Sequence, residues 1–102
     1  MKKQTLALVA AAAVVALAAS SASAETKILK FGHDNKVDPF ENPAHACTAV
    51  FANIVEADTN GAVKVEVYPS NQLGTAAEHV QMVRDDVIQA TLTSTGALAS
   101  YY

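Results

Sequence analysis

Apolar and polar residues follow one another along this chain in a pattern that predicts three strands separated by two helices. Residues 27–32 form a short apolar run that ends at a glycine, which indicates a strand covered on both faces. Residues 63–68 alternate with a period of two, and residues 88–95 are rich in β-branched side chains, so both segments predict strands. Strands that alternate with helices indicate an α/β fold with a parallel sheet in the order β-α-β-α-β.

The first helix is predicted over residues 43–59. Asn42 followed by Pro43 is typical of a helix start, and the pair at residues 60 and 61, Asn-Gly, is typical of a left-handed helix end. Five apolar side chains at helical spacing predict its buried face. They are Cys47, Val50, Phe51, Ile54 and Val55.

The second helix is predicted to begin at a capping box. Thr75 is followed three residues later by Glu78, and the helix is expected to reach about Asp86. Its buried stripe is expected to consist of Val80, Val83 and Val87. Polar segments containing proline, residues 33–42 and 69–74, are predicted to be loops.

Residues 1–24 have the three-part pattern of a secretory signal peptide. Two lysines precede a 14-residue apolar run at residues 6–19, and small residues lead to a cleavage site after Ala24. The run is shorter than the ~20 apolar residues that span a bilayer. We therefore expect residues 1–24 to be removed on export and residues 25–102 to form the mature chain.

Removing the leader changes the composition. Of the remaining 78 residues 35 are hydrophobic, about 45%, and 5 basic against 10 acidic residues give a net charge of −5. An acidic chain without a basic patch argues against nucleic acid as a partner. The single cysteine allows no intrachain disulfide, and so short a domain is marginal without one. We expect either a small unsupported domain or the beginning of a longer protein.

Polar residues follow each predicted strand. In an open parallel sheet, ligands bind beyond the carboxyl ends of the strands, so these residues predict a site for a small polar ligand. They are His33, Asp34 and Asn35 after the first strand, residues 68–71 after the second, and Ser94, Thr95 and Gly96 after the third. The alternative is that they only cap strands and turns.

A metal or other cofactor is not expected. The candidate ligands are His33, Asp34, Asp38, His45 and His79. His45 and His79 belong to different predicted helices, and no paired spacing brings three or four such ligands together as zinc requires.

Enzymatic signatures are also missing from the sequence. Cys47 lies on the predicted apolar helix face, where a thiol is an inert core residue rather than a nucleophile. There is no GxSxG, Walker or GxGxxG motif. Glu66, Asp85 and Asp86 are expected to be solvated surface charges. We therefore expect no catalytic residues.

Three segments of the sequence resemble the solute receptors of TRAP transporters, of the DctP type. Residues 30–33 read Lys-Phe-Gly-His just after the leader, and residues 63–74 read VKVEVYPSNQLG, which is the specific part. Residues 93–98 agree with the same family. The resemblance covers essentially the whole mature chain.

The resemblance implies a periplasmic protein of two α/β lobes hinged around a solute, usually an organic acid, which is passed to membrane permease subunits. Residues 25–102 then correspond to an incomplete first lobe, and the chain to an N-terminal fragment. By position, the residues facing the cleft are Asp34 or Asn35 and Thr93, Ser94 and Thr95, with Tyr68 and Pro69 shaping the floor. The arginine that clamps a solute carboxylate in such receptors lies beyond Tyr102.

Two other classes of function stay open at this point. One is a secreted α/β enzyme whose catalytic residues lie beyond residue 102. The other is a complete small interaction module, which predicts cooperative unfolding of residues 25–102 alone.

Overall fold

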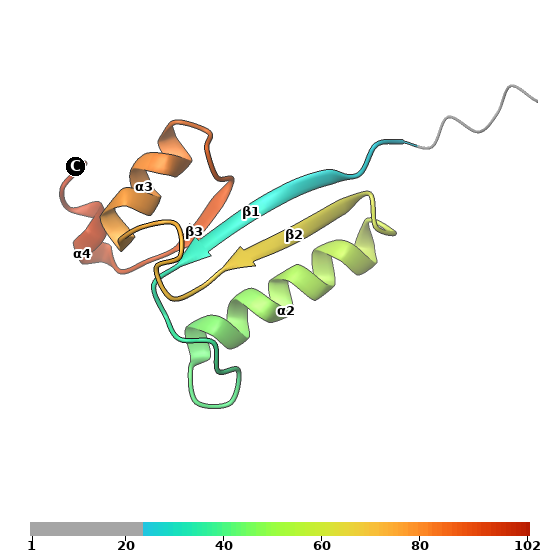
Figure 1. The fold of residues 1–102 in the computed structure, drawn as a ribbon, viewed down its shortest axis with the longest axis horizontal. Coiled ribbons are helices and arrows are strands. Elements are labelled where there is room, and N and C mark those ends of the chain that lie inside the picture. The colour runs from blue at the N-terminus through green and yellow to red at the C-terminus, as the bar shows by residue number, and fades with distance from the viewer. Residues whose placement is uncertain (1–23) are drawn as a thin grey trace, which may run out of the picture.

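A computed structural model describes residues 24–102 of the chain (Figure 1). The predicted signal peptide lies outside the described residues, apart from Ala24. The elements are β1 (Lys27–His33), α2 (Pro43–Asp58), β2 (Val63–Tyr68), α3 (Ala76–Arg84), β3 (Ala90–Leu92) and α4 (Thr95–Leu98). The predicted α/β class and the order β-α-β-α-β are confirmed. No helix within residues 24–102 is long and apolar enough to cross a membrane.

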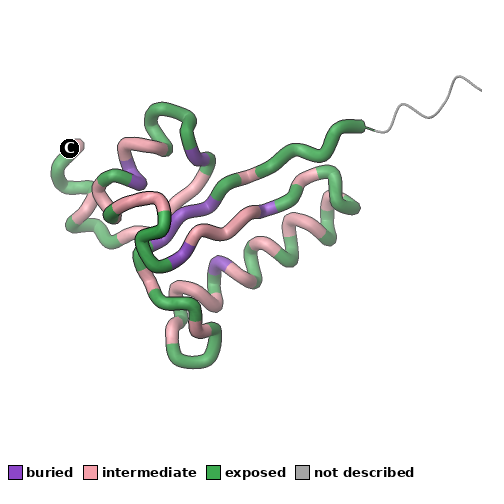
Figure 2. The backbone as a smooth tube through the Cα atoms, in the orientation of Figure 1, coloured by how far each residue is buried: buried purple, intermediate pink, exposed green. Residues whose placement is uncertain are grey.

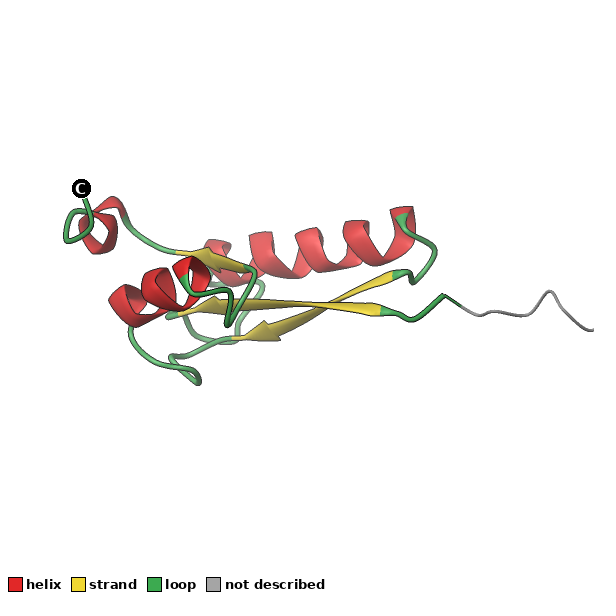
Figure 3. Cartoon of the chain, turned by 90° about the horizontal axis from the view of Figure 1, so that it is seen from above, coloured by secondary structure: helices red, strands yellow, loops and turns green. Residues whose placement is uncertain are grey.

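The strands form one parallel sheet with the order β2-β1-β3. β1 pairs with β2 from Lys27 opposite Val63 to Gly32 opposite Tyr68. It pairs with β3 only over its last three residues, where His33 lies opposite Leu92. In Figure 3 the three arrows point the same way, and the carboxyl ends of all three strands therefore lie at one edge of the sheet.

The helices α2 and α3 cover opposite faces of the sheet. Phe31 packs edge-to-face on Phe51 of α2, with 5.5 Å between the ring centroids. Gly32, the next residue, lies against His79 of α3. Neighbouring residues of a strand point to opposite faces, so the two helices are on different sides. Figure 1 shows α2 running along β1 and β2, whereas α3 lies beside their ends.

The start and end of α2 are as predicted. The side chain of Asn42 accepts hydrogen bonds from the backbone amides of Ala44, at 3.1 Å, and His45, at 3.4 Å. At the other end Asn60 and Gly61 have positive φ angles of 50° and 76°. A glycine and an asparagine adopt this left-handed geometry at low cost, which explains why the helix ends there.

The capping box of α3 is confirmed. The backbone amide of Thr75 donates to the Glu78 carboxylate at 2.7 Å, and that of Glu78 donates to the Thr75 hydroxyl at 3.3 Å. The backbone hydrogen bond from Thr75 lowers the pKa of the Glu78 carboxyl. The helix ends at Arg84 rather than near Asp86, because the chain turns through a positive φ of 58° at Asp86.

The predicted buried face of α2 is wrong. Thr48 is the residue of α2 that is fully buried, whereas Val50 and Ile54 are 57% and 53% exposed, and Cys47 is exposed rather than in the core. Thr48 lies about a quarter turn from the middle of the predicted face, at ~100° per residue. The most buried position of α2 holds the small, polar Thr48, and the spacing of large apolar residues does not reveal this.

Few of the described residues are buried (Figure 2), and the buried apolar core is small. Its members are Phe31, Val65, Val80 and Ile88. Of the stripe predicted on α3 only Val80 is buried, while Val83 and Val87 are exposed, so this prediction was wrong for two of three residues. α3 lies against the sheet at β3 and near the end of β1, where His79 meets Gly32.

The third strand is shorter than predicted. Residues 88–95 were expected to form it, but the pairing with β1 covers only Ala90–Leu92. β1 ends at His33 and offers no partner beyond it. Ile88 is buried before the strand begins, and Thr95 starts α4 instead of ending β3.

Side chains from α2 and its end occupy the outer edge of β2. The backbone amide of Val65 donates to the Glu56 carboxylate at 3.2 Å. The backbone amide of Val63 donates to the hydroxyl of Thr59 at 3.1 Å. These donors point away from β1, and on an edge strand they would otherwise face solvent.

Replacing Gly32 by alanine should destabilise the fold, because an added Cβ would lie 3.2 Å from Nε2 of the buried His79. Overpacking of this kind costs about 1–3 kcal/mol of unfolding free energy. Urea unfolding followed by circular dichroism measures it. The matched control is Gly96→Ala, whose Cβ would meet nothing closer than 3.7 Å. Equal stability of Gly32→Ala and the wild type would show that His79 can move aside.

Candidate functional site

The polar residues predicted to form a site lie at one edge of the sheet. Gly32 pairs with Tyr68, and His33 pairs with Leu92, so the three strands end side by side. The segments that follow them therefore emerge at the same edge, as the parallel topology requires. Within residues 24–102, no hydrogen bond joins the side chains of residues 33–35 to those of residues 93–95.

His33 is the last residue of β1 and is completely buried. Its Nε2 lies 3.1 Å from Nδ1 of His45 on α2. Its Nδ1 accepts a hydrogen bond of 3.1 Å from the backbone amide of Asn35. Both ring nitrogens are thus occupied, and the imidazole connects the strand end to the helix and to the loop.

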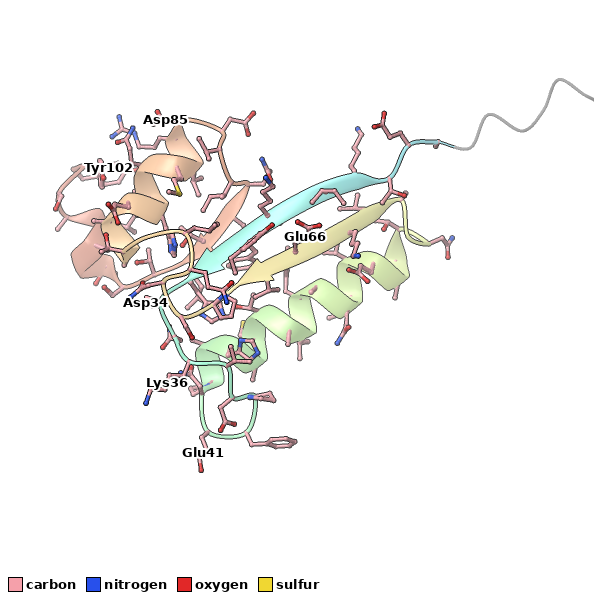
Figure 4. The ribbon with its side chains drawn as sticks, in the orientation of Figure 1. Asp34, Lys36, Glu41, Glu66, Asp85 and Tyr102 are labelled. Carbon is pink, nitrogen blue, oxygen red and sulfur yellow. The ribbon has the colours of Figure 1, made fainter. Side chains whose placement is uncertain are left out.

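Asp34 and Asn35 begin the loop after β1. Asp34 is exposed, and its carboxylate accepts a 2.8 Å hydrogen bond from the Asn35 side chain. The side-chain oxygen of Asn35 accepts from Asn42 at 3.4 Å. Figure 4 shows Asp34 at the end of β1, while Lys36 and Glu41 lie further along the loop. Asp34 therefore places an exposed carboxylate at this edge.

The loop after β2 is attached to the loop after β1. The backbone amide of Ser70 donates to the carbonyl of Asn35 at 2.9 Å, and that of Asn71 donates to the carbonyl of His33 at 3.3 Å. Ser70 and Asn71 both have positive φ angles, 54° and 57°. This tight turn brings their backbone amides to face the first loop.

Tyr68, at the end of β2, is occupied by a neighbour on its own strand. Its hydroxyl donates to the carboxylate of Glu66 at 2.8 Å. This hydrogen bond, together with burial, raises the pKa of Tyr68. The pair lies along β2, so the phenol belongs to the sheet surface rather than to the loops.

The segment after β3 offers hydroxyl groups of two kinds. The Thr93 hydroxyl is buried and has no hydrogen-bond partner among the described residues. Ser94 and Thr95 are exposed, and the Ser94 hydroxyl makes no cap to α4. His79, beneath Gly32, is a second unsatisfied group, since neither ring nitrogen has a partner in the described part of the chain.

The charge state of His33 follows from its surroundings. Burial lowers the pKa of His33 from its ordinary 6.5, and His45 lowers it further. Asp34 acts in the opposite direction, while His79 adds to the lowering. The neutral imidazole is therefore the form that the fold favours at neutral pH.

Metal binding finds no support in this geometry. Among residues 24–102, no group of three or more His, Cys, Asp or Glu side chains is placed to hold a metal ion.

A hollow of about 300 Å³ lies away from this edge, between α3 and the residues after α4, lined among others by Val80, Arg84 and Tyr101. The guanidinium of Arg84 lies 5.1 Å from the centre of the Tyr101 ring.

Sequence reasoning missed two residues of this edge, Asn42 and His45. Asn42 was identified only as a helix cap and His45 only as a rejected metal ligand. Yet a helix that follows a strand through a short loop begins near the end of that strand, so its first turn faces the same edge. His45 is the third helical residue of α2, and this position is the signal that could have identified it.

A comparison with protein families finds a match over residues 31–102 to the family model DctP, bacterial extracellular solute-binding protein, family 7. A relative from Rhodobacter capsulatus, named C4-dicarboxylate-binding periplasmic protein DctP, is 37% identical over 83 residues. That alignment covers 81% of this chain and 24% of the relative. The chain thus spans about a quarter of the length of that relative.

Solved structures show the same arrangement. A TRAP periplasmic solute-binding protein from Haemophilus influenzae with bound L-gulonate is 32% identical, with a TM-score of 0.60, over 67% of this chain and 22% of that one. A TRAP periplasmic solute-binding protein from Ochrobactrum anthropi has a TM-score of 0.69 over 78% of this chain and 24% of that one. At 22% identity the second structure shows the fold alone.

Replacing Asn42 by alanine should lower the free energy of unfolding by about 1 kcal/mol, since the amides of Ala44 and His45 lose their acceptor. Asn42→Ser keeps a capping oxygen and should stay within a few tenths of a kcal/mol of the wild type. Urea unfolding of both variants measures this. Equal losses for alanine and serine would assign the effect to the contact with Asn35 instead of the cap.

Proposed function

The chain belongs to the DctP family of bacterial extracellular solute-binding proteins, family 7, and we propose that it captures a small polar organic acid for a TRAP transporter. This is a family of solute-binding proteins and not of enzymes. The proposed place of action is the periplasm, after cleavage behind Ala24, and the proposed partners are the permease subunits. Residues 25–102 form part of the first lobe in this proposal, and closure of two lobes holds the solute.

The observation that carries the proposal is that polar residues follow parallel strands which end side by side at one edge of the sheet. His33, Asp34 and Asn35 come from the first strand end, and Thr93, Ser94 and Thr95 come from the third. A small solute held by several directed hydrogen bonds needs such a convergence of donors and acceptors. Asp34, Ser94 and Thr95 are exposed at this edge, as residues on one wall of a two-lobed cleft are expected to be.

The residues of the proposed site have different parts in it. Asp34, Ser94 and Thr95 are exposed and are proposed to contact the solute directly. Thr93 has a buried hydroxyl without a partner, which supports a role as hydrogen-bond donor toward the cleft. His33 is buried behind them with both nitrogens engaged, so its proposed contribution is to hold Asn35 in place.

The charge of Asp34 favours one class of organic acid. An exposed carboxylate repels a second carboxylate but accepts a hydrogen bond from a hydroxyl group. We therefore propose a hydroxy acid as the solute, with its hydroxyl groups toward Asp34. The relative from Haemophilus influenzae, which holds L-gulonate, supports this class, whereas the name of the relative from Rhodobacter capsulatus supports a C4-dicarboxylate.

Equilibrium binding to the intact gene product, measured by titration calorimetry, tests the proposal. The panel contains sugar acids such as gulonate, C4-dicarboxylates, and neutral sugars as controls. We expect the tightest binding among the sugar acids and none to neutral sugars. Tighter binding of C4-dicarboxylates would keep the function but overturn the role of Asp34, and no binding across the panel would overturn the function itself.

Replacing Ser94 by alanine should weaken binding of the preferred acid. The loss of one hydrogen bond costs ~1–1.5 kcal/mol, which corresponds to about a fivefold to tenfold rise in Kd. Ser100→Ala is the matched control, because Ser100 is exposed and lies beyond α4, outside the proposed site. Equal Kd values for the two variants would remove Ser94 from the site.

A further inference from the structure

Two histidines from different elements share a hydrogen bond behind the proposed site. Nε2 of His33 lies 3.1 Å from Nδ1 of His45, and the two rings meet edge-to-face with 5.3 Å between their centroids. His33 is completely buried and His45 is partly buried. Among residues 24–102, the other polar contact of the His33 ring is the backbone amide of Asn35.

The hydrogen bonds determine where the ring protons are. The backbone amide of Asn35 is a donor, so Nδ1 of His33 must be unprotonated to accept from it. A neutral His33 then carries its proton on Nε2 and donates it to His45. Nδ1 of His45 is the acceptor, and its own proton is on Nε2. No other arrangement of the neutral pair keeps both hydrogen bonds.

An additional proton breaks one of these hydrogen bonds wherever it binds. On Nδ1 of His33 it faces the amide of Asn35, donor against donor. On Nδ1 of His45 it faces the proton of His33, unless that proton moves to the other nitrogen and displaces Asn35. The pair therefore holds the loop only in its uncharged form.

We propose that His33 and His45 are positioning residues, which hold the Asp34–Asn35 loop ready for solute while the pair is uncharged and release it on acidification. The proposal rests on the proposed function, because the loop is part of the solute site. Loss of the hydrogen bond from the Asn35 amide to His33 frees Asn35 to move. The side chain of Asn35 contacts Asp34 and Asn42, so these residues move with it. A proton bound to the histidine pair thus changes the position of the exposed Asp34 carboxylate.

The groups that face the pair act in both directions. His45 of α2 and His79 of α3 disfavour a charge on His33, and Asp34 at the end of the same strand favours it. Burial, the largest of these effects, lowers the pKa of His33 below 6.5. The unfolded chain therefore takes up this proton first, so the associated stability is complete above about pH 6.5 and is lost as the pH falls toward the folded pKa.

Nitrogen NMR of the imidazole rings tests the pair without any solute. At pH 7.5 we expect both rings to carry their proton on Nε2. On titration to pH 5, the amide signal of Asn35 should shift and its hydrogen exchange should speed up at least tenfold, together with protonation of the pair. A proton on Nδ1 of either ring at pH 7.5, or an Asn35 amide that does not respond, would overturn the proposal.

Binding measured against pH tests the link to the solute. The probe is gulonate, which stays ionised over this range, and the intact gene product should bind it at least fivefold more weakly at pH 5 than at pH 7.5. His45→Asn places an oxygen near the position of Nδ1 that can accept from His33, so this variant should bind gulonate at pH 7.5 as tightly as the wild type does. His45→Leu has no acceptor and should bind gulonate more weakly than the wild type at both pH values. Ser100→Ala, outside both the histidine pair and the proposed site, is the control and should keep the wild-type profile.

The two experiments separate the possible failures. No binding of gulonate or the other acids at any pH would overturn the proposed function and the positioning role, while the ring spectra would still decide the proton arrangement. Binding that does not change with pH, or His45→Leu equal to the wild type, would overturn the positioning role and leave the proposed function standing.

Discussion

Backbone hydrogen bonding along both edges of β1 is the constraint on which the rest of this structure depends. β2 and β3 pair with β1 and not with each other. α2 packs on one face through Phe31 and His33, and α3 on the other face at Gly32. β1 therefore sets the positions of β2 and β3, while α2 lies mainly against β2, α3 against both β1 and β3, and α4 against α3. The end of β1 is consequently the place where helices, loops and strands all meet.

Much of the fold could be predicted because its signals are local. The caps at Asn42, Thr75 and Gly61 depend on neighbouring residues alone, and all three are present in the structure. The buried faces of the helices could not be predicted in the same way. Which side of α2 meets the sheet depends on how closely the backbones of helix and sheet approach. The buried position is held by Thr48, whereas the larger Ile54 is exposed.

The candidate site shows the same division. The rule that parallel strands end at one edge predicted that residues 33–35 and 93–95 follow neighbouring strand ends, and the pairing of His33 with Leu92 agrees with this. What the sequence did not reveal is that His33 points inward to α2, since a strand one residue longer than expected places it on a covered face. The end of β3 was missed for a related reason, because the length of a paired strand is set by its partner.

Side chains along the outer edge of β2 block that edge against pairing with a further strand, so a strand can be added to the sheet at one side only. Glu56 and Thr59 occupy the amides of Val65 and Val63 that another strand would need. A strand approaching from that side would have to displace a carboxylate already hydrogen-bonded to the backbone. Sheet extension is therefore directed to the far edge beyond β3, and self-association of two chains through their β2 edges is disfavoured.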